Sequence, residues 1–134
     1  MSGAVSGAVK TVLRIEGLCV LALTSFAYAK LGSGWGVFAA CFLLPDLAFL
    51  GYLAGPRVGA LAYNTTHSYI GAVLSLGAAM LAPGQMPLSV GLIWCAHIGF
   101  DRMLGYGLKY SLGFGFTHLG LIGREARRAA QGHG

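Results

Sequence analysis

The chain has few charged residues for its length. Of its 134 residues, nine are Lys or Arg and four are Asp or Glu, whereas 56% are hydrophobic and the mean hydropathy is +0.70. A soluble domain carries charge on about a quarter of its residues, so this chain lacks the side chains to cover a water-facing surface. The composition argues against a soluble enzyme or a DNA-binding domain.

Cysteine is also scarce. Cys19, Cys41 and Cys95 lie in apolar runs, and none belongs to a CxxC pair. Isolated cysteines in odd number are typical of small packed side chains, and not of disulfides, a redox centre or a thiolate metal site.

Long apolar runs fill most of the chain, and Gly and Pro combinations that end helices separate them. We expect helices over about 11–31, 35–54, 58–82 and 87–108, each able to cross a hydrocarbon core of about 30 Å. The runs do not alternate in polarity, which excludes barrel strands. The prediction is an all-α, polytopic membrane protein with four transmembrane helices, in one domain over 1–134 that ends in a Gly-rich cytoplasmic segment and basic tail over 109–134.

The basic residues predict the orientation. With four crossings both termini share one side, and nearly all Lys and Arg residues lie near that side, whereas Lys30 lies on the other. Positive charge is retained in the cytoplasm, so we expect an N-in and C-in topology. The tail around Arg124, Arg127 and Arg128 is expected to contact anionic lipid headgroups and not nucleic acid.

A secretory signal is the alternative interpretation of the N-terminal run. Lys10 and Arg14 precede the run, and Ala27-Tyr28-Ala29 resembles a cleavage site. Glu16 at the head of the run is unusual for a signal, and its removal would leave three crossings. We therefore expect the run to be a membrane helix.

Acidic residues and histidines lie inside the predicted helices. Counted from the cytoplasmic ends, Asp101 and Asn64 lie at a depth of about 10 Å, and Asp46, His67 and His97 at about 13–16 Å. An ionisable group at such a depth costs a few kcal/mol unless it has a partner, so a shared polar layer is a functional-site hypothesis.

The layer contains the ligand types of a metal site. Asp46, His67, His97 and Asp101 are the candidate ligands, and His97 and Asp101 at i, i+4 share a helix face. Imidazole with carboxylate suits Zn, Mn or Fe(II). A hydrogen-bonded network that only fixes helix register, or a proton relay or substrate site, are the alternatives. Pro45 is expected to kink the helix beside Asp46.

Other polar residues complete the hypothesis. Glu16 or His118 would handle the proton of a metal-bound water as catalytic residues. Arg102 is expected to be an interfacial anchor, with a pair to Asp101 or a phosphate as the alternative. The Gly-rich segment would bring Lys109 and His118 under the layer as a loop or re-entrant cover, unless His118 merely lies at the interface. His133 has no assigned role.

Several motifs, in order, carry a resemblance to a known family. They are 13–17 (LRIEG), 44–46 (LPD), 51–57 (GYLAGPR), 63–67 (YNTTH), 97–110 (HIGFDRMLGYGLKY) and 117–120 (THLG). Over roughly 11–123 the chain resembles a bacterial family of small four-helix membrane proteins catalogued as domain of unknown function 4260. The resemblance implies a multi-pass protein of the bacterial inner (plasma) membrane and implies no particular activity.

Three functions fit the sequence. The first is a hydrolase that uses a divalent metal, Zn or Mn, on a lipid-like substrate near the inner leaflet. The second is a small proton- or cation-coupled carrier, which with four helices would require a homo-oligomer. The third is a non-catalytic accessory protein in which the polar layer only specifies packing.

Overall fold

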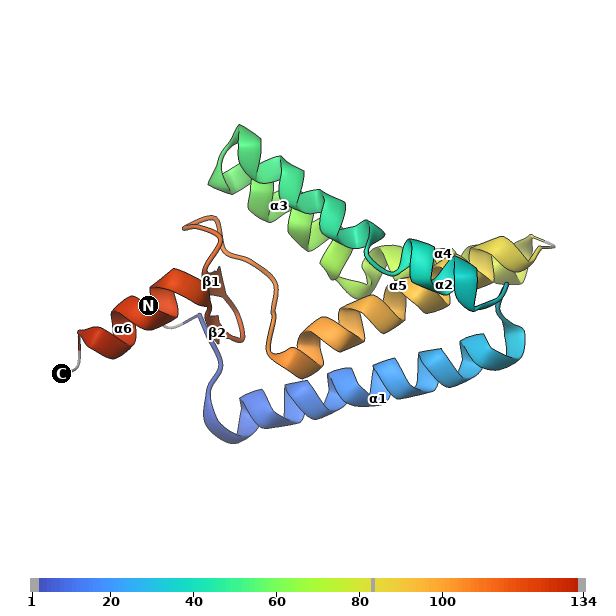
Figure 1. Cartoon of the computed structure of the whole chain (residues 1–134), viewed down its shortest axis with the longest axis horizontal. Helices are drawn as coiled ribbons and strands as arrows, with labels where there is room; N and C mark the ends of the chain where they lie inside the picture. Colours follow the sequence, from blue (N-terminus) through green and yellow to red (C-terminus); the bar gives the residue numbers. More distant parts are fainter. Residues whose placement is uncertain (1–2, 83, 133–134) are drawn as a thin grey trace.

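The structure is a computed structural model that describes residues 3–82 and 84–132. It is mostly helical, as predicted. The elements are α1 (Gly7–Leu31), α2 (Trp35–Cys41), the 3₁₀ helix η1 (Leu44–Ala54), α3 (Pro56–His67), α4 (Tyr69–Leu81), α5 (Gln85–Leu104), β1 (Phe116–Thr117), β2 (Gly120–Leu121) and α6 (Gly123–Gln131). The chain runs back and forth along its long axis, and the segment before α1 lies at the same end of the molecule as the hairpin and α6 (Figure 1), where the amide of Val5 donates to the carbonyl of His118.

Helix α5 is the centre of the packing, with α1 along one side and α4 along another. Most of the buried residues of the long helices belong to α5. Glycines allow the close approach of α1 and α5: a Cβ added to Gly17 would lie 2.7 Å from the carbonyl oxygen of Gly99, and one added to Gly99 would lie 2.7 Å from that of Gly17. Small residues at helix contacts are typical of membrane helices.

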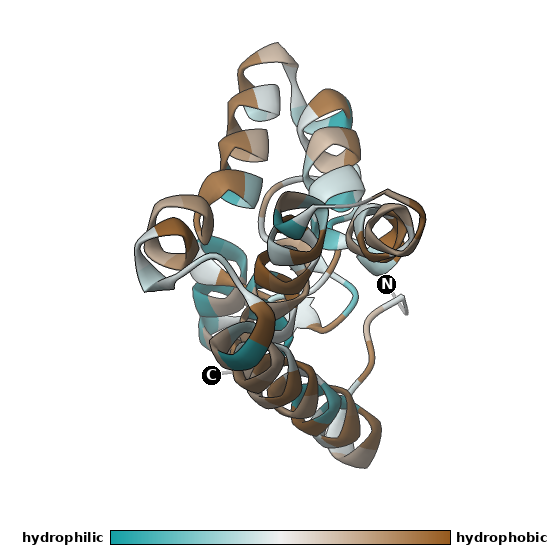
Figure 2. Cartoon of the chain, turned by 90° about the vertical axis from the view of Figure 1, so that its right-hand side faces the viewer, coloured by the Kyte–Doolittle hydropathy of each residue, from teal (hydrophilic) through white to brown (hydrophobic). Residues whose placement is uncertain are grey.

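Large apolar side chains cover the outside, and polar ones lie inside. Leu23 of α1, Leu53 of η1 and Met80 of α4 are exposed, and hydrophobic segments occupy the outer helices in Figure 2. His67 and His97, in contrast, are buried. By length and composition alone, the helical stretches Gly7–Leu31 and Trp35–Ala54 could each cross a membrane.

The helix predicted over 35–54 is divided into α2 and η1. Pro45 has no amide hydrogen, so it cannot donate the α-helical bond at this point. The next amide, that of Asp46, donates instead to the carbonyl of Leu43, three residues back, at 3.0 Å. The chain then continues as a 3₁₀ helix as far as Ala54. The prediction of an irregularity at Pro45 is confirmed, but a single α-helix over 35–54 is wrong.

The helix predicted over 58–82 is also divided. Ser68 has φ −85° and ψ 155°, an extended conformation that ends α3 at His67 and starts α4 at Tyr69. A single uninterrupted helix over this range is therefore wrong. The chain beside both Asp46 and His67 thus departs from a regular α-helix.

The segment after α5 is more ordered than a Gly-rich loop. An antiparallel hairpin pairs Phe116 with Leu121 and Thr117 with Gly120, and α6 follows it. The all-α prediction did not include this hairpin. Pro83, part of the predicted turn before α5, and His133 lie outside the described residues.

Candidate metal centre

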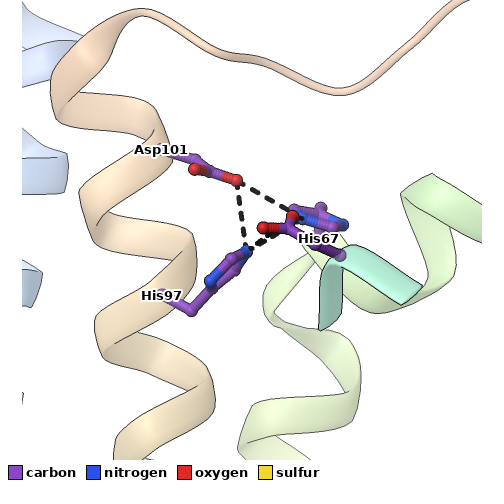
Figure 3. Close-up of side chains that lie close together, drawn as sticks. His67, His97 and Asp101 are labelled. Carbon is purple, nitrogen blue, oxygen red and sulfur yellow. Dashed lines mark hydrogen bonds and ion pairs between the residues drawn. The ribbon is translucent and has the colours of Figure 1, made fainter. Parts of the chain in front are cut away.

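Four side chains converge where η1, α3 and α5 meet. The Nε2 atoms of His67 and His97 lie 3.0 Å apart, and Asp46 Oδ1 lies 3.1 Å from the first and 3.3 Å from the second. Asp101 Oδ2 lies 3.3 Å from His67 Nε2 and 3.4 Å from His97 Nε2. Figure 3 shows His67, His97 and Asp101 directed toward one another from α3 and α5. The four ligands that the sequence predicted are therefore brought together.

The helical geometry explains how Asp46 reaches His67. A turn at Gly55, where φ is 114°, followed by Pro56 as the first residue of α3, folds η1 against α3. Asp46 lies nine residues before this turn, about 18 Å at the 3₁₀ rise of about 2.0 Å per residue. His67 lies twelve residues after it, also about 18 Å at the α-helical rise of about 1.5 Å. If η1 were an α-helix, Asp46 would lie only about 14 Å from the turn at Gly55. It would then stop short of the level of His67.

The distances match those of a coordination sphere. Ligand nitrogens and oxygens at about 2.0–2.2 Å from Zn²⁺ lie about 3.3–3.6 Å from one another in a tetrahedral arrangement, and neighbouring ligands about 2.8–3.1 Å in an octahedral one. All five contacts between an imidazole and another member of the group fall between 3.0 and 3.4 Å, and the four atoms all lie within 4.8 Å of one another.

Hydrogen bonds fix the orientation of the His67 ring. Its Nδ1 lies 2.9 Å from the carbonyl oxygen of Tyr63, which can only accept, so Nδ1 carries the hydrogen and Nε2 presents a lone pair. The hydroxyl of Thr66 lies 2.8 Å from the same Nδ1 and donates to the carbonyl of Pro45 at 3.1 Å. The ring also stacks on Tyr63, with centroids 3.7 Å apart. Such partners on the second ring nitrogen are typical of metal-ligating histidines.

Side chains of α5 hold the broken end of α3 in place. The indole of Trp94 donates to the carbonyl of Thr66 at 2.6 Å, and the guanidinium of Arg102 donates to that of His67 at 3.0 Å. These are carbonyls that the helix break leaves without α-helical partners. The element that carries His97 and Asp101 therefore also positions His67.

Few hydrogen atoms are available for hydrogen bonds between the four side chains of this group. Because His67 carries its hydrogen on Nδ1, only His97 can place one on a nitrogen that faces the group, unless a histidine or a carboxyl takes up an additional proton. The described part of the chain gives neither carboxylate an ion pair with Lys or Arg; their ion pairs are with the two histidines. Buried acceptors crowded at such distances require a cation or extra protons between them.

The carboxylates open onto a cavity of about 330 Å³. The side chains of His67 and His97 are 1% exposed, whereas those of Asp101 and Asp46 are 14% and 33% exposed. Lys109 lines the same cavity, and its burial lowers its pKa to about 8. The imidazoles therefore close the inner side of the group and the carboxylates face the opening.

Asn64 belongs to the support of this cavity and not to the ligand group. Its side-chain amide donates to the carbonyl of Lys109 at 2.8 Å and its oxygen accepts from the amide of Lys109 at 2.7 Å. It thus fixes the segment after α5 against α3, three residues before His67.

Glu16 and His118 line a different cavity. It has a volume of about 620 Å³ and is bordered also by Tyr69 and Arg102. His118 accepts a hydrogen bond from the amide of Leu108 at 2.8 Å, and burial together with the Arg102 guanidinium lowers its pKa. The structure therefore does not place the predicted proton-handling residues with the ligands. Arg102 pairs with backbone carbonyls and not with Asp101.

Sequence reasoning missed several supporting residues. Tyr63, Thr66 and Trp94 hold the imidazole of His67 or the end of its helix. Tyr63 lies four residues before His67, a spacing that predicts contact on one helix face, whereas Thr66 is the neighbour of His67 in the chain and has no such signal. No comparable signal points to Trp94, because its partner lies 28 residues away.

The fold and site define a mostly helical protein with a buried group of two histidines and two aspartates. The family model described as domain of unknown function (DUF4260) matches residues 10–122, and the chain belongs to this family. No curated protein and no solved structure matches the chain.

Proposed function

We propose that this protein binds one divalent metal ion, Zn²⁺ or Mn²⁺, at Asp46, His67, His97 and Asp101, and uses it to hydrolyse a lipid-like substrate at the inner face of a bacterial membrane. The observation that carries the proposal is the crowding of four potential ligand atoms, two imidazole nitrogens and two carboxylate oxygens, at coordination-sphere distances. A network that only fixed helix register would pair donors with acceptors, whereas the Nδ1 hydrogen of His67 is directed to Tyr63 and away from the group.

The four ligands leave room for a reacting water. A divalent ion held by two imidazoles and two carboxylates would have room for a further ligand and would supply Lewis-acid activation of a water there. The carboxylates border the cavity, so that position faces the opening. Asp46 and Asp101 border this cavity and would be the proton acceptors for such a water, since Glu16 and His118 line the other cavity.

The membrane topology proposed is N-in and C-in with four crossings. They are α1, then α2 with η1, then α3 with α4, and finally α5. The outward apolar side chains support it, as does the location of the segment before α1 and of α6 at one end of the molecule. Arg124, Arg127 and Arg128 of α6 would then lie at anionic headgroups on the cytoplasmic side.

Metal analysis of the full chain, purified in detergent, tests the proposal. After incubation with zinc or manganese and removal of the excess, we expect one ion per chain. His67→Ala and His97→Ala should lose it, while the control His118→Ala, the same substitution on the second cavity, should keep it. The absence of stoichiometric metal in the unmutated protein, or full retention in a His67→Ala, His97→Ala double variant, would overturn the proposal.

A further inference from the structure

We propose that the cavity beside the metal centre receives a phosphate group, and that Lys109 is the residue that binds it. The inference rests on the proposed metal function and names its substrate class: a phosphate ester. The observation behind it is a buried ammonium group that shares the cavity with two metal-facing carboxylates but forms no ion pair with them.

The ammonium of Lys109 retains free hydrogen-bond donors. Lys109 is 4% exposed, and its Nζ donates to the carbonyl of Phe114 at 2.9 Å. A lysine ammonium has three donors, so two remain. The rings of Phe114 and Tyr63 hold the same nitrogen, at 3.8 and 4.8 Å from their centroids. No carboxylate of the described residues lies within ion-pair distance of it. Burial lowers the pKa of Lys109, and Asp101 partly offsets this because it attracts the ammonium and favours its charged form, but it does not pair with it directly. This buried ammonium therefore has no direct anionic partner among the described residues.

The position of Lys109 is coupled to that of a metal ligand. Asn64 holds the Lys109 backbone with two hydrogen bonds. The backbone of Lys109 also forms an isolated antiparallel β-bridge with that of Thr117. Asn64 and His67 are one turn apart on α3, so one helix sets the place of both the imidazole and the lysine. Preorganised cations at fixed distances are what phosphoryl groups require.

The charges of the loaded site favour an anion. Two carboxylates offset a divalent ion when both imidazoles are neutral, so the Lys109 ammonium leaves one positive charge in excess. A phosphate oxygen can then contact the metal while another accepts from Lys109. The aromatic rings of Phe49 and Tyr106 also line the cavity and offer apolar surface to the organic part of an ester. A ligand whose only charge is positive would be repelled.

Calorimetric titration of the manganese-loaded full chain in phosphate-free detergent tests the inference. The probes are inorganic phosphate and short-chain phosphatidic acid, which separate a soluble phosphate from a lipid headgroup. Lys109→Met should weaken phosphate binding about tenfold or more, because it removes a charge-assisted hydrogen bond. Lys109→Arg should keep most of the affinity, and Lys10→Met, which removes a lysine that does not line this cavity, should leave it unchanged.

Metal content, measured on each variant without phosphate, separates the two proposals. Stoichiometric manganese together with equal phosphate affinity in Lys109→Met and the unmutated chain would overturn the role of Lys109 and leave the metal centre standing. Absence of manganese in the unmutated chain would overturn the metal centre itself. Stronger binding of phosphatidic acid than of inorganic phosphate would assign the phosphate to a lipid, and the opposite order to a soluble compound.

Discussion

Two cavities meet the same end of α5, and their polar residues are held in different ways. Asp101 lines the cavity of the metal centre, whereas its neighbour Arg102 lines the larger cavity with Glu16 and His118. In the first, every ligand atom lies within 4.8 Å of the others. In the second, no hydrogen bond or ion pair links Glu16, Arg102 and His118 to one another among the described side chains.

This difference shows that depth along a helix does not determine what a side chain does. Consecutive residues of an α-helix point about 100° apart. Asp101 and Arg102 therefore face different cavities although they lie at nearly the same depth. Convergence on a common centre distinguishes a ligand site from polar residues that only share a level.

The largest expected effect is on metal affinity, and it should differ between the carboxylate of Asp101 on one cavity and that of Glu16 on the other. Asp101→Asn should weaken manganese or zinc binding by more than about 100-fold, because the loss of even a supporting residue costs about 10–100-fold. Glu16→Gln, the equivalent change on the larger cavity, should leave metal affinity unchanged. Competition titration with a fluorescent chelator measures both. Equal affinities in the two variants would remove the distinction between the cavities.

A smaller effect is expected from the support of the His67 ring. Thr66→Val removes the hydroxyl that contacts His67 Nδ1 and the Pro45 carbonyl, and should lower metal affinity by about tenfold. Thr65→Val is the matched control, since the Thr65 hydroxyl donates only to the carbonyl of Leu61 on its own helix. The same chelator competition applies, and a loss of equal size in Thr65→Val would contradict a specific role for Thr66.

The smallest expected effect is on the pH dependence of the melting temperature, through His118 in the larger cavity. His118 has a pKa below its ordinary value of 6.5 when folded, so the unfolded chain takes up its proton first as the pH falls. Its stabilisation is complete above pH 6.5 and is lost as the pH falls through the lowered pKa. His118→Asn keeps an acceptor for the Leu108 amide without titrating, so its Tm should fall less between about pH 7.5 and pH 5, by on the order of a few degrees.

Thermal unfolding of both proteins in the same detergent, at each pH, measures this difference. The other histidines are the same in both proteins, so the comparison isolates His118. Identical slopes of Tm against pH would show that His118 contributes nothing to the pH dependence.

The sequence predicted that two histidines and two aspartates would come together, but not the path of the chain that brings them together. Asp46, His67, His97 and Asp101 were selected because they lie in apolar runs, where such residues need partners. Glu16 also lies in such a run but lines the other cavity, so this signal alone did not separate the two groups. The 3₁₀ helix after Pro45 and the break at Ser68 were not predictable from hydropathy. Both depend on tertiary partners: folding η1 against α3, and the donors Trp94 and Arg102 on the carbonyls next to the break.

The sequence also did not predict which polar residues line which of the two cavities. It depends on the rotation of α1 and α5 about their axes, which the Gly17 and Gly99 contact fixes. The place of His118 depends on the hairpin of β1 and β2, whose strands of two residues each are too short to leave a pattern.

X-ray absorption at the zinc edge of the zinc-loaded full chain tests the central claim most directly. The account predicts nitrogen and oxygen ligands at about 2.0–2.2 Å, with outer-shell scattering from two imidazoles. In His97→Ala the scattering should fall to that of one imidazole. Sulfur scattering at about 2.3 Å, or a two-imidazole spectrum that persists when both His67 and His97 are replaced by alanine, would contradict it.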